Sequence, residues 1–281
     1  MLKRTLTTLV LIPPVVYLIG WSPNWAFLLA VAGAVALGLR EYFALCRRMG
    51  VRACEWAGYA GGVLVSLAPG MATQGDFMPV SAALLISLLL VSTLALERGP
   101  FWADYLGATS LTLFGILYIG LSLACLEFLR NHGQPAEFQG TLAAVPRVAP
   151  HPLFFLFVVI WAGDICAYLI GHLVGHTPFF PRISPRKTWE GALGGLAGSL
   201  MAAWAYAHWF WAGAGYATAG LVALAGQAGD LVESAIKRAA GQKDSGALLP
   251  GHGGFLDRID SLLFGAPAMW LAVLLLGLHS P

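Results

Sequence analysis

The amino-acid sequence predicts an all-α protein that crosses a membrane many times. Of its 281 residues, 58% are hydrophobic and only 11% are charged, whereas a soluble domain carries about 25% charged residues. The hydrophobic residues form long runs, many of them close to the length of about 20 residues that a helix needs to cross a bilayer. Strands of a membrane barrel would instead alternate apolar and polar residues. The chain therefore reads as a bundle of transmembrane helices.

Nine apolar segments can be counted, and the breaks between them are polar, charged or rich in glycine and proline. The first is expected to be an uncleaved helix and not a signal peptide, because Pro13 and Pro14 interrupt it and no convincing cleavage site follows. We therefore expect about nine transmembrane helices. The segments comprise residues 5–21, 24–41, 55–69, 78–96, 101–128, 152–175, 188–211, 214–237 and 261–278.

The distribution of Lys and Arg predicts the orientation. If the N-terminus is cytoplasmic, only Arg130 and Arg147 of the 16 basic residues lie outside, which leaves 14 inside, as the positive-inside rule requires. We expect a multi-pass protein of the cell (inner) membrane with a cytoplasmic N-terminus and an external C-terminus. Residues 1–128 would supply N-terminal membrane helices, and residues 129–281 the catalytic helices with their cytoplasmic loops, within one integral membrane unit.

The candidate chemistry gathers around the last cytoplasmic loop, residues 238–260. From Gly229 the chain reads GDLVESAIKRAAGQKDSGALLPGHGGFLDRIDS, which is densely charged in a protein that otherwise avoids charge. Helical spacing places Asp230, Ser234 and Lys237 on one face, and likewise places Asp257, Asp260 and Ser261 together at the start of the final helix. The glycines between these groups, Gly251, Gly253 and Gly254, allow a ligand to approach the backbone closely.

Carboxylates interleaved with Lys and Arg at a membrane surface are typical of magnesium-dependent phosphoryl transfer. Asp oxygens bind Mg²⁺, which takes substrate phosphates as further ligands, and the cations neutralise the remaining phosphate charge. A structural explanation exists for individual residues: Asp257 as a helix N-cap, Asp260 as a first-turn acid, and Glu233 with Lys237 as a pair one turn apart. The whole set together favours a functional site.

Two further features lie outside this loop. The stretch SPRKTWEG, residues 184–191, contains Lys187 and could be a basic anchor, although an anchor does not explain Glu190. Asp164 lies inside an apolar span, where a charge is costly and is functional by default; pairing with a cation is the structural alternative. Glycines spaced along the next helix predict close helix packing: Gly191, Gly194, Gly195 and Gly198.

The run SAIKRAAGQKDSGALLPGHGGFLDRID, residues 234–260, resembles the signature of the phosphatidate cytidylyltransferases, also called CDP-diacylglycerol synthases. The similarity extends over 27 residues with fixed spacing, and residues 184–191 and the helix of Asp164 also resemble that family. The N-terminal half matches only in general character. The resemblance implies the reaction of CTP with phosphatidate to give CDP-diacylglycerol and diphosphate in phospholipid biosynthesis.

The resemblance also implies roles for individual residues. Mg²⁺, with room for a second cation, would be bound by Asp230 and Asp257, helped by Asp260 and Asp164. Expected partners are CTP, phosphatidate, the lipid bilayer and a second copy of the chain in a homodimer, with no nucleic acid. Catalytic roles fall to Asp230, Asp257, Lys237, Lys243 and Arg258, and substrate or nucleotide binding to Lys187, Ser234, Arg238, Asp244, His252, Gly253 and Gly254.

Two alternatives remain open from the residues alone. A CTP-dependent kinase of polyprenol-like or other lipid alcohols would use similar groups. A membrane transporter fits less well, because most charges lie at one interface and no internal repeat is visible. A CDP-alcohol phosphatidyltransferase would need a DGxxAR run with paired aspartates, which this sequence lacks.

Overall fold

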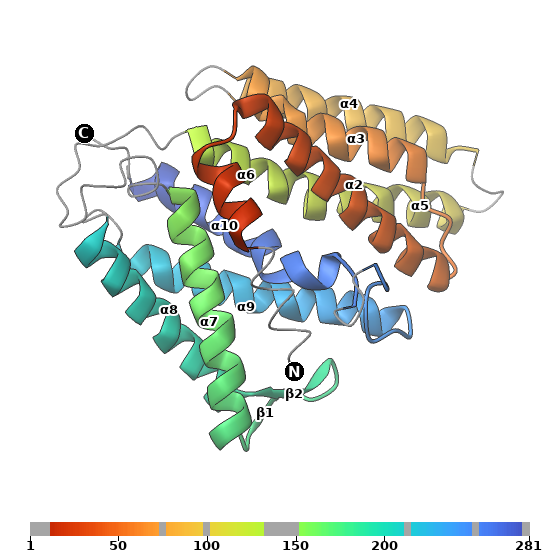
Figure 1. Cartoon of the computed structure of the whole chain (residues 1–281). Helices are drawn as coiled ribbons and strands as arrows, with labels where there is room; N and C mark the ends of the chain where they lie inside the picture. Colours follow the sequence, from red (N-terminus) through yellow and green to blue (C-terminus); the bar gives the residue numbers. More distant parts are fainter. Residues whose placement is uncertain are drawn as a thin grey trace. The chain divides into compact units, whose positions relative to one another are not determined.

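The computed structural model describes residues 12–72, 77–97, 102–131, 152–210, 215–248 and 253–276. Helices dominate these residues, which confirms the predicted helical class (Figure 1). Residues 12–20 are helical. The elements that follow are α2 (Asn24–Arg48), α3 (Glu55–Leu67), η1 (Ala68–Met71), α4 (Met78–Ala95), α5 (Trp102–Gly115), η2 (Ile116–Leu121), α6 (Ser122–Asn131), α7 (Pro152–Val174), β1 (Pro178–Phe180), β2 (Ser184–Thr188), α8 (Trp189–Trp209), α9 (Tyr216–Ala239) and α10 (Leu256–Leu276).

Among the described residues, five helices are long and apolar enough to cross a membrane. The predicted segment at 55–69 forms α3 and η1, and the 13 residues of α3 are fewer than a spanning helix needs. Helices α8 and α9 form where spans were predicted but are not among the five, and part of the first predicted span lies outside the described residues. Nine spans therefore stay a prediction. The five are Asn24–Arg48, Met78–Ala95, Trp102–Asn131, Pro152–Val174 and Leu256–Leu275.

The described residues form two compact units. Unit 1 is drawn from Met1–Pro14, Ser22–Glu127 and Ile236–Ile259, and unit 2 from Val15–Trp21, Phe128–Ala235 and Asp260–Pro281. Because these divisions fall inside α9 and α10, the end of α9 and the start of α10 belong to unit 1, and the remainder of both helices belongs to unit 2.

Helices α2, α3, α4 and α5 pack side by side in unit 1 (Figure 1). The side chains of Val35 and Leu39 on α2 are fully buried in this core. A Cβ atom added to Gly62 of α3 would lie 2.6 Å from Cδ1 of Leu39. Helices in lipid gain little from the hydrophobic effect between them and depend on such close contacts between small residues. Glycine on α3 therefore permits the packing of unit 1.

In unit 2, α7 and α8 pack along each other. The glycine spacing on α8 predicted close packing with a neighbouring helix, and the structure shows that this neighbour is α7. A Cβ at Gly194 would lie 2.5 Å from Cδ1 of Ile170, and one at Gly195 would lie 2.9 Å from Cβ of Ala167. The predicted packing role of these glycines is confirmed.

A short antiparallel hairpin, β1 and β2, connects α7 to α8 within unit 2. In the described part of the chain this hairpin departs from the all-α prediction, and it lies between the predicted spans 152–175 and 188–211. Pro178 pairs with Thr188 and Phe180 pairs with Ser184, with an irregularity between the pairs. The ring of Phe179 packs edge-on against Trp189 at a centroid distance of 4.4 Å. Sequence periodicity gives no signal for strands this short.

The last loop is shorter than the predicted 238–260, because α9 continues to Ala239 and α10 begins at Leu256. Gly241 ends α9 with a φ of +66°. Its N–H donates to the Arg238 carbonyl at 3.0 Å, and the Gln242 N–H donates to the Lys237 carbonyl at 2.8 Å. This pair of bonds is a Schellman motif, for which glycine is favoured because it adopts positive φ without strain.

Candidate functional site

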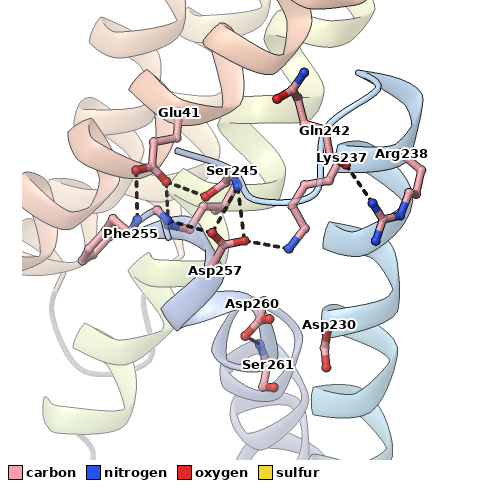
Figure 2. Close-up of polar contacts among 12 residues, drawn as sticks. Glu41, Asp230, Lys237, Arg238, Gln242, Ser245, Phe255, Asp257, Asp260 and Ser261 are labelled. Carbon is pink, nitrogen blue, oxygen red and sulfur yellow. Dashed lines mark hydrogen bonds and ion pairs between the residues drawn. The ribbon is translucent and has the colours of Figure 1, made fainter. Parts of the chain in front are cut away.

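In unit 1 the loop between α9 and α10 is organised around an ion pair. Nζ of Lys237, near the end of α9, lies 2.6 Å from Oδ1 of Asp257 in the first turn of α10 (Figure 2). The two side chains are 11% and 9% exposed, respectively. A cation and a carboxylate withdrawn from solvent to this degree stabilise each other, and each would be costly without the other. The structure thus brings together two residues predicted to be catalytic.

Asp257 also anchors the loop through its other oxygen. Oδ2 accepts hydrogen bonds from the Gly254 N–H at 2.7 Å and the Ser245 N–H at 3.1 Å. Gly253 has a φ of +79°, and a Cβ there would lie 2.6 Å from Oδ2. Asp257 is therefore more than the helix cap of the structural alternative, because it ties Lys237, Ser245 and Gly254 to one carboxylate.

Glu41 of α2 is a member of this cluster that sequence reasoning missed. Its Oε1 accepts from the Phe255 N–H at 2.9 Å, and its Oε2 accepts from the Leu256 N–H at 2.8 Å and from Oγ of Ser245 at 2.7 Å (Figure 2). The residue is 7% exposed. The sequence did hold a signal: Glu41 follows an apolar run, and a carboxylate in a spanning helix is functional by default.

In unit 2 the hairpin brings Lys187 to Asp230. Nζ of Lys187 on β2 lies 2.5 Å from Oδ2 of Asp230 on α9, with side chains 28% and 33% exposed. This pair is more open to solvent than the pair in unit 1, so an anionic ligand could reach it. A cation and a carboxylate in this setting can respectively bind a phosphate and a divalent metal ion.

Glu190 explains how the hairpin keeps Lys187 in place. Its carboxylate accepts from Oγ1 of Thr177 at 2.8 Å and from the N–H groups of Thr177 and His176 at 3.2 Å. The hydroxyl of Thr188 caps α8 by accepting from the Gly191 N–H at 3.2 Å. Glu190 therefore joins the start of α8 to His176 and Thr177, the residues that follow α7. A basic membrane anchor would not explain this role.

Three more predicted or neighbouring residues meet in unit 2. Oγ of Ser261 donates to Oδ1 of Asp164 at 3.4 Å, while Oδ1 of Asp260 accepts from the Ser261 N–H at 2.8 Å. A Cβ at Gly229 would lie 2.6 Å from the Asp260 carbonyl oxygen, so α9 and α10 are in close contact at this point. Ser261 of α10 thus contacts Asp164 of α7 through its hydroxyl and the adjacent Asp260 through its N–H.

The other predicted site residues have varied positions. Ser234 is buried, whereas Arg238, Lys243, Asp244 and Arg258 are exposed. Nη1 of Arg238 donates to the Gln242 carbonyl at 3.0 Å (Figure 2). Gly254 is buried against Oγ of Ser245 and Oε2 of Glu41, where a side chain would collide. His252 lies outside the described residues.

The carboxylates can be compared with the requirements of Mg²⁺. Within the described ranges, no group of three or more His, Cys, Asp and Glu side chains is arranged to hold a metal ion. Both oxygens of Asp257 accept from N–H donors. In unit 2, Asp164, Asp230 and Asp260 supply oxygen ligands of the kind that Mg²⁺ prefers. Since Mg²⁺ commonly takes only one or two protein carboxylates and completes its shell with water and phosphate, the unit 2 carboxylates fit it better than Asp257 does.

Comparison with known proteins places this arrangement in context. The profile described as "Cytidylyltransferase family" matches residues 2–276. The chain is 34% identical over 274 residues to a phosphatidate cytidylyltransferase of Synechocystis sp., covering 90% of each chain. It is 40% identical over 160 residues to a phosphatidate cytidylyltransferase of Brucella suis, covering 56% of this chain and 54% of that relative. It is 34% identical over 274 residues to phosphatidate cytidylyltransferase 5, chloroplastic, of Arabidopsis thaliana, covering 86% of this chain and 64% of the relative.

Proposed function

Because this chain belongs to the cytidylyltransferase family, we propose that it transfers the cytidylyl group of CTP to phosphatidate, forming CDP-diacylglycerol and diphosphate. The observation that carries this assignment is similarity along nearly the whole chain to a relative named phosphatidate cytidylyltransferase. The product would serve phospholipid biosynthesis. The residues of the 234–260 signature support the assignment, since Lys237 and Asp257 form the organising contact of the loop.

The reaction needs no nucleophile from the protein, because the lipid phosphate is already ionised at neutral pH. One of its oxygens attacks the α-phosphorus of CTP and forms a new P–O bond. The bond from the α-phosphorus to the oxygen that bridges to the β-phosphorus breaks, and its electron pair leaves with diphosphate. Catalysis then depends on in-line positioning and on stabilising the negative charge that shifts to the leaving group.

Different Lys and Arg side chains would bind the phosphate groups and hold the loop in place. Lys187 is partly exposed beside Asp230, so its ammonium can exchange a carboxylate contact for a phosphate contact. Lys243 in the loop and Arg258 in the first turn of α10 are both exposed and would bind the triphosphate and the lipid phosphate. Lys237 is buried with Asp257 and would act mainly by holding the loop. The remaining candidates are proposed to contact a substrate or to set the shape of the nucleotide-binding loop. They are Ser234, Arg238, Asp244, His252, Gly253 and Gly254.

We further propose Mg²⁺ as the cofactor, with a second cation as a possible addition. Asp230, Asp164 and Asp260 would hold it, and their oxygen chemistry supports this choice. When bound, the ion would neutralise phosphate charge and favour the departure of diphosphate. Asp257 stays a predicted ligand as well, although it would have to give up its contacts with Lys237 and the loop amides to bind a metal.

The proposed setting is the cell (inner) membrane, with nine spans, a cytoplasmic N-terminus and a site facing the cytoplasm. Five apolar helices and the one-sided distribution of Lys and Arg support this topology. A homodimer is proposed from the family resemblance. Lipid tails would then approach the site from the bilayer, between helices.

The test is diphosphate release by the protein purified in detergent. CTP, phosphatidate and Mg²⁺ are supplied together and then omitted one at a time. We expect release only when all three are present, with CDP-diacylglycerol as the lipid product. Transfer of the terminal phosphate of CTP to a lipid alcohol, without diphosphate release, would contradict the proposal and favour the kinase alternative.

A further inference from the structure

We propose that Glu41 is a positioning residue for the charged loop, and that it sets the start of α10 for the reaction assigned above, on which this inference rests. Glu41 lies on α2, far outside the 234–260 signature in sequence. Its hydrogen-bonding partners on the loop all lie within residues 245–256 of the signature. A side chain more than 200 positions earlier in the sequence thus holds this loop.

The contacts of Glu41 satisfy the beginning of α10. The first N–H groups of a helix have no partner within the helix and carry a partial positive charge, so a carboxylate is well suited to receive them. Glu41 accepts the N–H groups of Phe255 and Leu256 through separate oxygens, at 2.9 and 2.8 Å. Glu41 is 7% exposed and Leu256 is fully buried, so water is poorly placed to replace these bonds. Burying these donors without an acceptor would be costly.

Ser245 links Glu41 to Asp257. Its Oγ donates to Oε2 of Glu41 at 2.7 Å, while its N–H donates to Oδ2 of Asp257 at 3.1 Å. The two carboxylates, one on α2 and one on α10, therefore accept hydrogen bonds from the same loop residue (Figure 2). A shift of Glu41 would be passed on to the residue that also orients Asp257.

Two glycines leave room for the Glu41 carboxylate. A Cβ at Gly246 would lie 2.6 Å from Oε1, and one at Gly254 would collide with Oε2. The glycine pattern of the signature is explained in part by this buried carboxylate, in addition to any ligand that approaches the loop. The loop and Glu41 are thus complementary in shape as well as in hydrogen bonding.

The role is positional, because Glu41 contacts residues of the protein's own loop, namely Ser245, Phe255 and Leu256. Misplacing a catalytic group by about 1 Å can reduce a rate by about 100-fold. Loss of the Glu41 carboxylate is therefore expected to lower kcat more than it raises KM for CTP.

The experiment compares Glu41→Gln with Thr112→Val in the full-length protein in detergent. Gln keeps the size of Glu but replaces one acceptor oxygen with an NH₂ group. Thr112 is a matched control because it is fully buried in unit 1 and its hydroxyl accepts from the Cys54 N–H at 2.9 Å. Neither Thr112 nor Cys54 belongs to the loop between α9 and α10. Hydrogen exchange of peptides covering residues 253–258 and the kinetic constants for CTP are measured for each protein.

We expect Glu41→Gln to speed exchange at residues 253–258 and to lower kcat by about 10-fold to 100-fold, with KM changed by less than about 3-fold. Thr112→Val should leave both loop exchange and kcat near wild type even where it lowers Tm. Unchanged exchange and unchanged kcat in Glu41→Gln would overturn the proposal, as would equal effects in both variants.

A second variant and a readout that does not depend on activity keep the proposal falsifiable. If Glu41→Gln does not fold, Ser245→Ala removes a single bond to Glu41 and is expected to give a smaller change in the same direction; no change in loop exchange would then contradict the proposal. If the wild-type protein makes no CDP-diacylglycerol, the proposed function fails, whereas the exchange measurement still reports whether Glu41 holds the loop.

Discussion

Lys237 of α9 and Asp257 of α10 form an ion pair inside unit 1, with Nζ 2.6 Å from Oδ1, and this pair closes the loop that carries the family signature. Replacing Lys237 with Met is expected to lower the free energy of unfolding by about 3 kcal/mol, because Asp257 would be left as a buried charge without its cation. Chemical unfolding in detergent measures the change.

The double variant Lys237→Met with Asp257→Leu separates the ion pair from the loop anchor. Replacing a buried ion pair by apolar residues is often neutral in stability. Here Asp257 also accepts the N–H groups of Ser245 and Gly254, so the double variant should stay less stable than wild type. Full recovery of stability would show that the amide contacts contribute nothing.

Asp257→Asn is expected to reduce turnover by at least about 100-fold, because the amide cannot hold Lys237 and the loop together as a carboxylate does. The measurement is CDP-diacylglycerol formation at saturating CTP. Asp104→Asn is the control, since Asp104 is an exposed acid on α5 outside the cluster. Near-normal turnover in Asp257→Asn would overturn a role for its charge.

Lys187→Met should separate activity from stability. The pair with Asp230 is about one-third exposed, and ion pairs in such settings contribute no more than about 1 kcal/mol. We therefore expect a small change in Tm but a loss of activity of about 100-fold, since an ammonium that binds phosphate is removed. Arg182→Gln is the control, because Arg182 is exposed in the turn between β1 and β2. This variant should retain activity. A large loss of Tm in Lys187→Met would point to a structural role instead.

Gly254→Ala tests whether the loop glycine is required by packing. The added methyl group would meet Oγ of Ser245 and Oε2 of Glu41, so we expect at least about a 10-fold loss of activity and faster exchange in residues 253–258. Gly220→Ala is the matched control, because nothing lies within 4 Å of a Cβ at that position in α9. Equal activity in both glycine variants would contradict the packing explanation.

Glu190→Gln tests the anchoring of the hairpin. The substitution removes one of the two oxygens that accept hydrogen bonds from Thr177 and His176. Hydrogen exchange in residues 177–188 should therefore increase, and activity should fall because Lys187 is held less firmly. Glu97→Gln, an exposed change in unit 1, should leave that exchange unchanged. Unaltered exchange in Glu190→Gln would show that the hairpin holds Lys187 without this contact.

Much of the architecture follows from local sequence. Apolar runs predict the helices, and glycine spacing predicts that α8 packs closely against another helix, because both patterns are read from residues near one another along the chain. The cluster of charges between α9 and α10 was visible for the same reason.

What the sequence could not predict depends on partners that are distant in the chain or on elements too short for periodicity. Glu41 meets Phe255 across 214 positions, and no local pattern indicates such a contact. Glu190 stood out as unexplained, but its partners lie on the unpredicted hairpin. Asp257 was singled out from its place in the charged run, while its contacts with the N–H groups of Ser245 and Gly254 depend on the folded loop.

The most direct test of the central claim follows the phosphates of CTP. Purified protein is given phosphatidate, Mg²⁺ and CTP labelled at either the α-phosphate or the γ-phosphate. We predict that α-label enters the lipid fraction as CDP-diacylglycerol and that γ-label leaves only as diphosphate. Entry of γ-label into a lipid, with α-label remaining in a soluble nucleotide, would contradict cytidylyl transfer.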